Sequence, residues 1–524
     1  MLGSASLVTK FVDRFAREWT SADKVASRAL ALSAAVVFAV VASFVFGFTV
    51  DDALITARYA ANLNAGEGYR FNSGGPASDG VTPLGYAHVL APFAVSTQAA
   101  LTAAKWIGLS STALAVFLAA RVSQQDLGIR ARWLSALPLV VLSVSPQLAA
   151  WAVSGMETGL VTLLVTVGVF ARSRREGTAL TERFGVLALG LAAALRPELF
   201  PAMVVLAVAP PLGRPSGAGP AAVDDNPNAR AIRAVVGGVG RAAFVLLPLA
   251  CVTLARLIIF GAATPLSVMA KRPDLERGLE YAAASVILIG AVQLVSLALL
   301  RDARGRWLVS AVVVHVAAVA LAGGDWMALS RLFVPMLPVL ALAAQRAAAQ
   351  APWPLTLLRS GLAFVCALFA WNAVGWNVGR VGGDREVLVA AMRAPLASAK
   401  IIAAVDIGWP ALAAPHANIV DLAGVTDAEI ARLPGPHTQK RIPEGLLDAR
   451  SVDALVFNVP CGTPLAEDWT KTPFIHAVER RLASEHGARD VFEPTYEHRS
   501  RPCYVVLTRR EGASRPAKPA NAGF

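Results

Sequence analysis

Long apolar runs separated by short polar segments fill the first 377 residues of this chain. The first runs from Leu30 to Phe48 without a charged residue. A helix needs about 20 apolar residues to cross the hydrocarbon layer of a membrane, and this pattern predicts about 11 spans. We therefore expect a mostly α-helical, polytopic transmembrane bundle, with spans near residues 30–48, 99–120, 133–152, 158–171, 184–195, 198–209, 242–262, 281–300, 307–322, 332–345 and 355–375.

The pattern changes near residue 378, where polar residues and prolines become frequent. Short apolar runs at 400–405, 418–421, 453–457 and 504–507 alternate with helical patterns at 427–433 and 472–484. This alternation is typical of an α/β domain, which we expect outside the membrane at 378–510. Residues 1–29 are predicted to be a cytoplasmic arm before a retained signal anchor, residues 30–377 the transmembrane domain, and residues 511–524 a disordered tail.

Composition supports a membrane protein, since 55% of the residues are hydrophobic and only 16% are charged. Charged residues make up about a quarter of an ordinary soluble protein. The net charge of +12 comes mainly from loops expected in the cytoplasm and from the N-terminal arm, and no soluble face interleaves basic and aromatic residues. We therefore expect a bilayer partner and no nucleic acid. No P-loop, dinucleotide fingerprint or HExxH motif is present.

The positive-inside rule orients the predicted spans. Arginine-rich loops at 121–132, 172–183, 214–241 and 301–306 then lie in the cytoplasm. The C-terminal domain is expected on the exported, periplasmic side of the inner membrane, where an oxidising compartment allows Cys461 and Cys503 to pair, although sequence does not decide whether they do. The same exported face gathers Asp51, Asp52, Glu157, Arg196, Glu198, Lys271, Arg272 and Asp325.

Carboxylates, cations and aromatic rings at a membrane boundary suit a reaction on a phosphate-bearing lipid. A sugar linked to polyprenyl phosphate is already activated, because the phosphate leaves readily. One carboxylate that takes the proton from an acceptor hydroxyl would then suffice, with cations binding the phosphate. Glycoside hydrolysis, in contrast, usually needs a pair of carboxylates.

The segments Asp51–Ala60, Gly66–Asn72 and Asp79–Leu84 together resemble the first exported loop of the GT-C membrane glycosyltransferases. The resemblance is narrowest to the terminal arabinofuranosyltransferases of mycobacterial and corynebacterial cell walls. Further matching segments follow in the same order: Ser154–Thr158, Arg196–Glu198, Thr264–Ser267, Gly323–Met327 and Val420–Asp427. The chain departs from the family pattern at Ala53 and in the spacing before Arg331, which puts the identity of the sugar in doubt.

The resemblance implies a GT-C type bundle with a catalytic first exported loop at 49–98. It implies inverting transfer of a sugar, expected to be arabinofuranose, from a polyprenyl-phosphate donor to a cell-envelope glycan acceptor. A first-loop aspartate, Asp51 or Asp52, is implied as the general base. Because Asp52 directly precedes the expected helix 53–62, where a carboxylate would cap the first turn, we expect Asp51 to be the base and Asp52 its support.

The remaining site residues follow from their charge and position. Arg58, Arg196, Lys271 and Arg272 are expected to bind the donor phosphate, and substrate contacts are expected from Tyr59, Glu157, Glu198, Asp325, Trp326 and Arg331. Each also has a structural alternative. Glu157 can stabilise a helix N-terminus, Arg196 and Glu198 can pair with each other, and the cations at 271–272 can lie among lipid headgroups. Asp421 and Asp427 are expected to pack or cap the C-terminal domain.

Three alternatives stay open at this point. The sugar donor can be a hexose within the same superfamily. A polytopic bundle with internal charges also suits a transporter or flippase of lipid-linked glycans, although such proteins often contain paired repeats, which this sequence lacks. No cofactor is assigned, and a divalent cation is left open because two adjacent aspartates can bind one but lack an evident third ligand.

Overall fold

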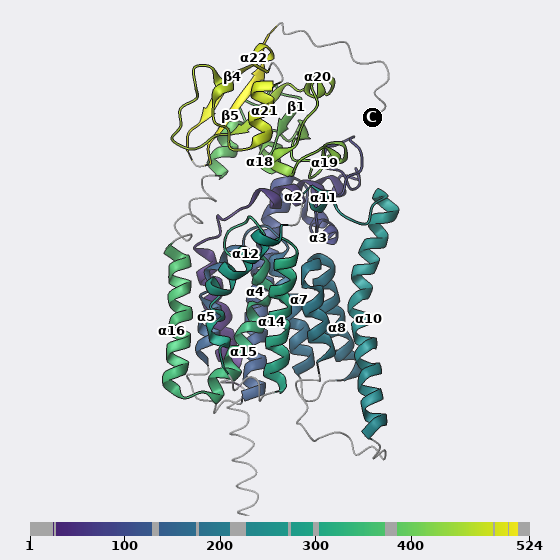
Figure 1. Ribbon diagram of the computed structural model, residues 1–524, viewed down its shortest axis with the longest axis vertical. Coiled ribbons are helices and arrows are strands. Elements are labelled where there is room, and N and C mark those ends of the chain that lie inside the picture. Colours follow the sequence, from purple (N-terminus) through teal and green to yellow (C-terminus); the bar gives the residue numbers. More distant parts are fainter. Residues whose placement is uncertain are drawn as a thin grey trace, which may run out of the picture.

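The computed structural model describes residues 25, 28–127, 136–173, 178–209, 227–270, 274–296, 303–372, 385–485, 488–500 and 502–511 (Figure 1). A bundle of helices forms one end of the molecule and a small domain built on a β-sheet forms the other. Lys271 and Arg272, both predicted to bind phosphate, lie outside the described residues, as do the arm before residue 25 and the tail after residue 511.

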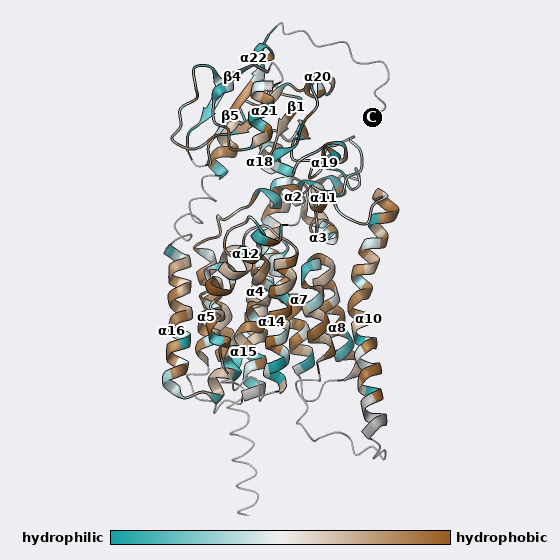
Figure 2. Cartoon of the chain, in the orientation of Figure 1, coloured by the Kyte–Doolittle hydropathy of each residue, from teal (hydrophilic) through white to brown (hydrophobic). Residues whose placement is uncertain are grey.

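Apolar sequence in the first part of the chain forms helices that run along the long axis (Figure 1). They are the helix Arg28–Ser43, α4 (Thr97–Leu127), α5 (Leu137–Ser143), α6 (Pro146–Ala152), α7 (Thr158–Ser173), α8 (Ala179–Leu195), α9 (Phe200–Val208), α10 (Pro227–Phe260), α12 (Leu275–Leu288), α14 (Ala303–Leu321), α15 (Leu337–Gln350) and α16 (Trp353–Ala370). Their residues are mostly apolar, whereas the sheet domain has more polar residues (Figure 2).

Five helices in the described part of the chain are long and apolar enough to cross a membrane. They are Thr97–Gln124, Ile232–Phe260, Ala303–Leu321, Arg331–Gln350 and Trp353–Ala370, and each overlaps a predicted span. Other predicted spans fall on apolar helices of 10–17 residues. The span expected at 281–300 is interrupted, because α12 ends at Leu288 and the chain continues as the 3-10 helix η4 (Ala291–Leu294). The total of about 11 spans therefore remains a prediction.

The C-terminal domain is built on a five-stranded mixed sheet. Its strands are β1 (Ile401–Ala404), β2 (Asn418–Asp421), β3 (Ala454–Asn458), β4 (Phe492–His498) and β5 (Tyr504–Arg509), in the order β2-β1-β3-β5-β4. β1 is parallel to β2 and β3, and β5 is antiparallel to β3 and β4. The short apolar runs form β1, β2, β3 and β5 as predicted.

Strand β4 was not predicted, and its sequence explains why. It contains Pro494 and several polar residues, a pattern that argues against a central strand. The structure accommodates the proline at the sheet edge, where the pairing with β5 shifts register between Pro494 and Tyr496.

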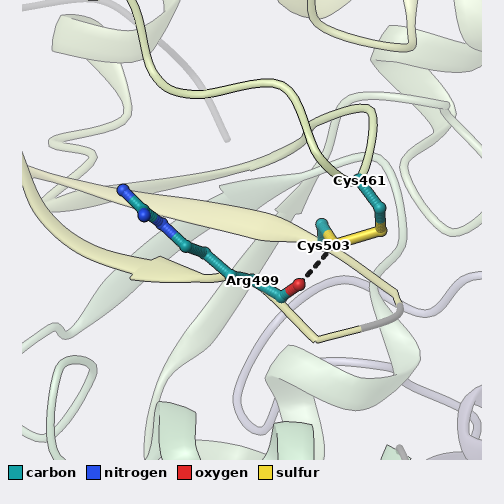
Figure 3. The surroundings of a disulfide bond; sticks show 3 residues. All are labelled: Cys461, Arg499 and Cys503. Carbon is teal, nitrogen blue, oxygen red and sulfur yellow. Dashed lines mark hydrogen bonds between the residues drawn. A yellow bond between two sulfur atoms is a disulfide. The ribbon is translucent and has the colours of Figure 1, made fainter.

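A disulfide joins the loop after β3 to the residue before β5. Cys461, just after β3, is bonded to Cys503, which directly precedes β5 and lies near Arg499 (Figure 3). The sequence had left this pairing open. Because the bond ties a loop to a strand of the core, it stabilises the domain in a compartment that keeps it oxidised.

Short helices occupy the junction between the bundle and the sheet domain (Figure 1). They are α2 (Asp51–Asn64), α3 (Leu84–Leu90) and α11 (Leu266–Met269) from the first part of the chain, and α18 (Gly408–Ala413) and α19 (Ala428–Arg432) from the C-terminal domain. Segments more than 300 residues apart in sequence therefore meet here, and most of the residues predicted to be functional lie at this junction.

Candidate active site

Helix α2 presents two different faces at the junction. It begins at Asp51, with Val50 as a cap that makes no side-chain bond, so Asp52 is not the cap that the sequence predicted. Successive residues of a helix point about 100° apart. Asp51 and Arg58, seven residues apart, consequently face the C-terminal domain, whereas Asp52 and Thr56 line a cleft. We name these the docking face and the cleft face of α2.

On the docking face, the Asp51 carboxylate binds the start of α18. Oδ2 accepts a hydrogen bond from the Gly408 amide and Oδ1 one from the Trp409 amide, both at 2.9 Å. Burial, and then the neighbouring carboxylate of Asp406, raise the pKa of Asp51 to about 7, despite the opposing effects of Arg385 and the two amides. The approach requires glycine at 408, because a Cβ there would lie 2.3 Å from the Asp51 carbonyl oxygen.

Arg58 also serves the docking face, and this corrects its predicted place at the donor phosphate. Its Nε donates to the Phe71 carbonyl at 2.7 Å, while Nη1 and Nη2 donate to the carbonyls of Ala411 and Ala417 at 3.3 and 2.8 Å. With its nitrogens bound to backbone oxygens and its side chain buried, Arg58 joins the first loop to the C-terminal domain. It does not line the cleft.

Tyr59 likewise lies in the interior. Its hydroxyl is 2.6 Å from the hydroxyl of Ser78 and accepts a hydrogen bond from the Gly80 amide at 3.2 Å. The ring stacks on Tyr69 with centroids 4.8 Å apart. The residue predicted to contact substrate therefore shapes the loop beneath the cleft and does not line it.

Asn72 adds a third docking contact. Its side-chain amide donates to the Ile419 carbonyl and its oxygen accepts from the Ile419 amide, both at 2.8 Å. Ile419 lies on β2, an edge strand of the sheet. The asparagine thus satisfies backbone groups that an exposed edge would leave free for pairing with another chain.

The cleft contains about 500 Å³ of empty space, part of it open to solvent. Its walls come from the first loop, the turn before α7, the turn between α8 and α9, the start of α11, the segment before α15 and the C-terminal domain. The lining residues are Asp52, Ile55, Thr56, Gly80, Val81, Thr82, Pro83, Met156, Arg196, Ser267, Arg331 and Val425. Polar side chains from four of these segments therefore converge on one space, a feature of ligand sites.

Asp52 is the carboxylate that lines this space. Its side chain keeps 35% of its surface exposed, whereas Asp51 as a residue is only 8% exposed. Among the described residues the nearest cation is Arg331, whose Nη1 is 3.8 Å from Oδ2 of Asp52. The positions expected of the two aspartates are therefore reversed: the carboxylate predicted to be the base is buried against α18, and the predicted cap faces the cleft.

Arg331 is held by two further contacts and by an unusual backbone. Its Nε donates to Oδ2 of Asp325 at 2.7 Å, and its guanidinium carbon lies 5.6 Å from the centre of the Trp151 ring. The two residues before it, Leu329 and Ser330, have φ angles of 62° and 52°. Such angles are costly for residues other than glycine and concentrate at functional sites. This tight turn directs the arginine toward the cleft.

Arg196 is the second arginine of the cleft. It forms an ion pair with the fully buried Glu157 and lies 3.6 Å from Glu198. Its side chain is only 9% exposed, and its Nη2 has no hydrogen-bond partner among the described residues. A buried guanidinium nitrogen without a partner costs free energy, and an anion in the cleft would satisfy it.

A buried ion pair that the sequence did not predict supports the residues at the base of the cleft. Asp79 pairs with Nε of Arg256 at 2.7 Å, and the same guanidinium donates to the carbonyls of Val81 and Thr82. The Thr82 hydroxyl is 3.2 Å from that of Ser267. Asp79 and Thr82 occur in the segments that carried the family resemblance, but Arg256 lies in an apolar helix, and nothing in the linear sequence connects it to them.

The C-terminal domain contributes one wall through Val425. The turn that carries it is ordered by Asp421, whose carboxylate accepts bonds from the Thr426 amide and hydroxyl and from the amides of Ala423 and Gly424. Burial raises the pKa of Asp421 to about 6. Asp427 caps α19. The predicted packing and capping roles of Asp421 and Asp427 are confirmed.

The structure thus brings together Asp52, Glu157, Arg196, Glu198, Asp325 and Arg331 of the predicted site residues. Trp326 is 59% exposed beside them and does not line the cleft. Among the described residues, no group of three or more His, Cys, Asp or Glu side chains could hold a metal ion. The two aspartates cannot share one, because Asp51 and Asp52 point to different faces of α2.

Comparison with known proteins returned no matching family model, curated protein or solved structure.

Proposed function

We propose that this protein is an inverting membrane glycosyltransferase. It transfers a sugar, arabinofuranose in the narrower reading, from a polyprenyl-phosphate donor to a cell-envelope glycan on the exported side of the membrane, with Asp52 as general base. The observation that carries the proposal is a carboxylate and two arginines around one cleft, where the apolar bundle ends and the polar domain begins.

In this mechanism the acceptor hydroxyl attacks the anomeric carbon of the donor sugar. A new carbon–oxygen bond forms on the face opposite the phosphate, the bond to the phosphate breaks, and the phosphate leaves with its electron pair. Asp52 takes the proton of the hydroxyl. The partly exposed carboxylate of Asp52 suits this task better than Asp51, because both oxygens of Asp51 already accept bonds from the backbone of α18.

The arginines stabilise the negative charge that grows on the leaving phosphate. Arg196 is the better donor, because its Nη2 has no partner among the described residues. Arg331 is bound to Asp325 and lies next to Asp52, so its positive charge is held beside the base. Preorganised donors of this kind each contribute about 10²–10³-fold to the rate of comparable enzymes.

The proposed orientation has independent support from the disulfide. Cys461 and Cys503 are bonded in the C-terminal domain, and such bonds persist in oxidising, exported compartments. The orientation is tested by treating intact cells with a membrane-impermeant reductant followed by an impermeant thiol label. We expect both cysteines to be labelled only after reduction, and labelling that requires broken cells would reverse the topology.

The reaction is tested with the full-length protein in lipid nanodiscs. Synthetic polyprenyl-phosphate arabinofuranose and a short arabinan acceptor are supplied, and the products are analysed by mass spectrometry. Transfer with inversion supports the proposal. Transfer from a polyprenyl-phosphate hexose alone would change the sugar and keep the reaction class, whereas movement of intact donor across the bilayer without transfer would favour a flippase.

A parallel assay with a chelator tests whether a divalent cation takes part. The described residues do not bring a third carboxylate or imidazole beside Asp52, so we expect transfer to continue after chelation. Loss of activity that returns with added magnesium would show that the donor phosphate recruits a cation.

A further inference from the structure

The carboxylate of Asp52 depends on the backbone of α2 for its position. The closest cation among the described residues is Arg331, at 3.8 Å, which is too far for a short, direct hydrogen bond. Asp52 lies in the first turn of the helix, where backbone amides have no intrahelical partner and the chain tends to fray. The position of the base is therefore only as well defined as this first turn.

Asp51, the residue next to the base, holds the first turn of α2 in place. Asp51 binds the amides of Gly408 and Trp409, and a Cβ on residue 408 would also lie 2.9 Å from Cβ of Leu54. One turn of α2 and one turn of α18 therefore pack in direct contact. A displacement of α18 would move Asp51, and the adjacent Asp52 would move with it.

The same domain also carries part of the cleft wall. Val425 lies in the turn ordered by Asp421 and lines the cleft. The next residue, Thr426, lies close to Gly80 of the first loop: a Cβ on residue 80 would be 2.6 Å from the Thr426 methyl group. Docking of the C-terminal domain thus sets the position of both the base and this wall.

We propose that Asp51 is a positioning residue that docks the C-terminal domain on α2 and thereby holds Asp52 and Val425 in one functional cleft. Asp51 does not touch the reacting atoms. Its effect on catalysis rests on the proposed glycosyl transfer, whereas its effect on docking does not depend on any activity.

The test alters the contact from both of its sides. Asp51→Ala removes the acceptor, and Gly408→Ala introduces a methyl group that the contact cannot accommodate. Asp51→Asn keeps one acceptor oxygen and serves as the conservative variant. Glu493→Gln, an exposed carboxylate on the edge strand β4, is the matched control. Full-length proteins in nanodiscs are compared by hydrogen exchange of peptides covering 406–411 and by kcat and KM for transfer.

We expect Asp51→Ala and Gly408→Ala to accelerate exchange at 406–411 and to lower kcat by about 10- to 100-fold, since small displacements of a catalytic group cost that much. The KM for the donor should change little, because the phosphate site lies on the bundle. The double variant should lose hardly more than either single variant, because both break one contact. Asp51→Asn should recover part of the loss, and Glu493→Gln should match the wild type.

Two results would overturn the inference. Unchanged exchange at 406–411 in both variants would show that Asp51 does not dock the domain. A wild-type rate in Gly408→Ala with accelerated exchange, beside an inactive Asp51→Ala, would show that Asp51 acts on the substrate directly. If the wild type transferred no sugar, the proposed function and the catalytic part of the inference would both fail, and exchange would still decide the docking role.

Discussion

The docking face and the cleft face of α2 carry the same residue type, aspartate, in two different roles. Asp51 and Asp52 are adjacent, identical side chains, yet one is buried with two backbone amides bound and the other lines a cleft beside an arginine. The arginines divide in the same way, since Arg58 binds backbone carbonyls, whereas Nη2 of Arg196, which lines the cleft, has no partner among the described residues. Residue type and charge therefore do not assign a role until the environment of each group is known.

The largest difference between the two faces should appear when Asp52 is replaced. Asp52→Asn removes the proton acceptor while preserving shape, and we expect transfer to fall by about 10²–10⁴-fold. Thermal unfolding should be unchanged, because the side chain is partly exposed and makes no buried bond. Turnover of both aspartate variants is measured with the synthetic donor. A greater loss in Asp51→Asn than in Asp52→Asn would return the base to the docking face.

Arg196 tests whether the cleft binds a phosphate. Arg196→Met should lower transfer by about 10²–10³-fold, and it should also destabilise the protein by about 3–5 kcal/mol, because Glu157 would be left buried without its counter-charge. Arg196→Met combined with Glu157→Met should regain much of the stability and none of the activity. Recovery of activity in the double variant would limit this arginine to a structural role.

The docking face should respond to pH through Asp51. The pKa of Asp51 is about 7 when docked, against 3.8 for an ordinary aspartate, because burial and Asp406 disfavour its charge. Docking therefore takes up a proton. It should be strongest at low pH, weaken as pH rises through about 7, and stay level above that. The charged and titratable groups around Asp51 are Asp406, Arg385 and Tyr504.

Hydrogen exchange at 406–411, compared at each pH between the wild type and Asp51→Asn, measures this effect. The comparison at equal pH removes the intrinsic pH dependence of exchange. A pH dependence that persists in Asp51→Asn would assign the titration to Asp406 or to another neighbour.

The smallest effect is expected at the wall that the C-terminal domain contributes. Val425→Ala removes two carbons from a partly buried side chain, and each methyl-sized group is worth about 0.8 kcal/mol when fully buried. We expect a change of about three-fold in the KM for the acceptor, with the donor KM unchanged. A change in the donor KM alone would place the lipid substrate against this wall.

Much of the architecture could be predicted from the sequence because it depends on local pattern. Apolar length predicted the five helices long enough to cross a membrane, and short apolar runs predicted four of the five strands. The fifth strand, β4, was not predicted because it contains Pro494. Proline is unfavourable inside a sheet and is tolerated here because β4 is an edge strand. The predicted gathering of Glu157, Arg196, Glu198 and Asp325 also occurs, with Arg331 bound to Asp325, since all of them lie at or near helix ends on the same side of the bundle.

The sequence by itself determined which residue types meet at this junction: a pair of aspartates, arginines and glutamates, next to apolar helices. Only the tertiary structure decided what each one does. Whether Asp51 or Asp52 faces the cleft depends on where α18 lies, more than 350 residues later in the chain. The partner of Asp79, Arg256, is an arginine near the C-terminal end of the apolar helix α10. Carboxylate chemistry is set by burial and by hydrogen-bond partners, and those come from segments that are distant in sequence and are brought together only by folding.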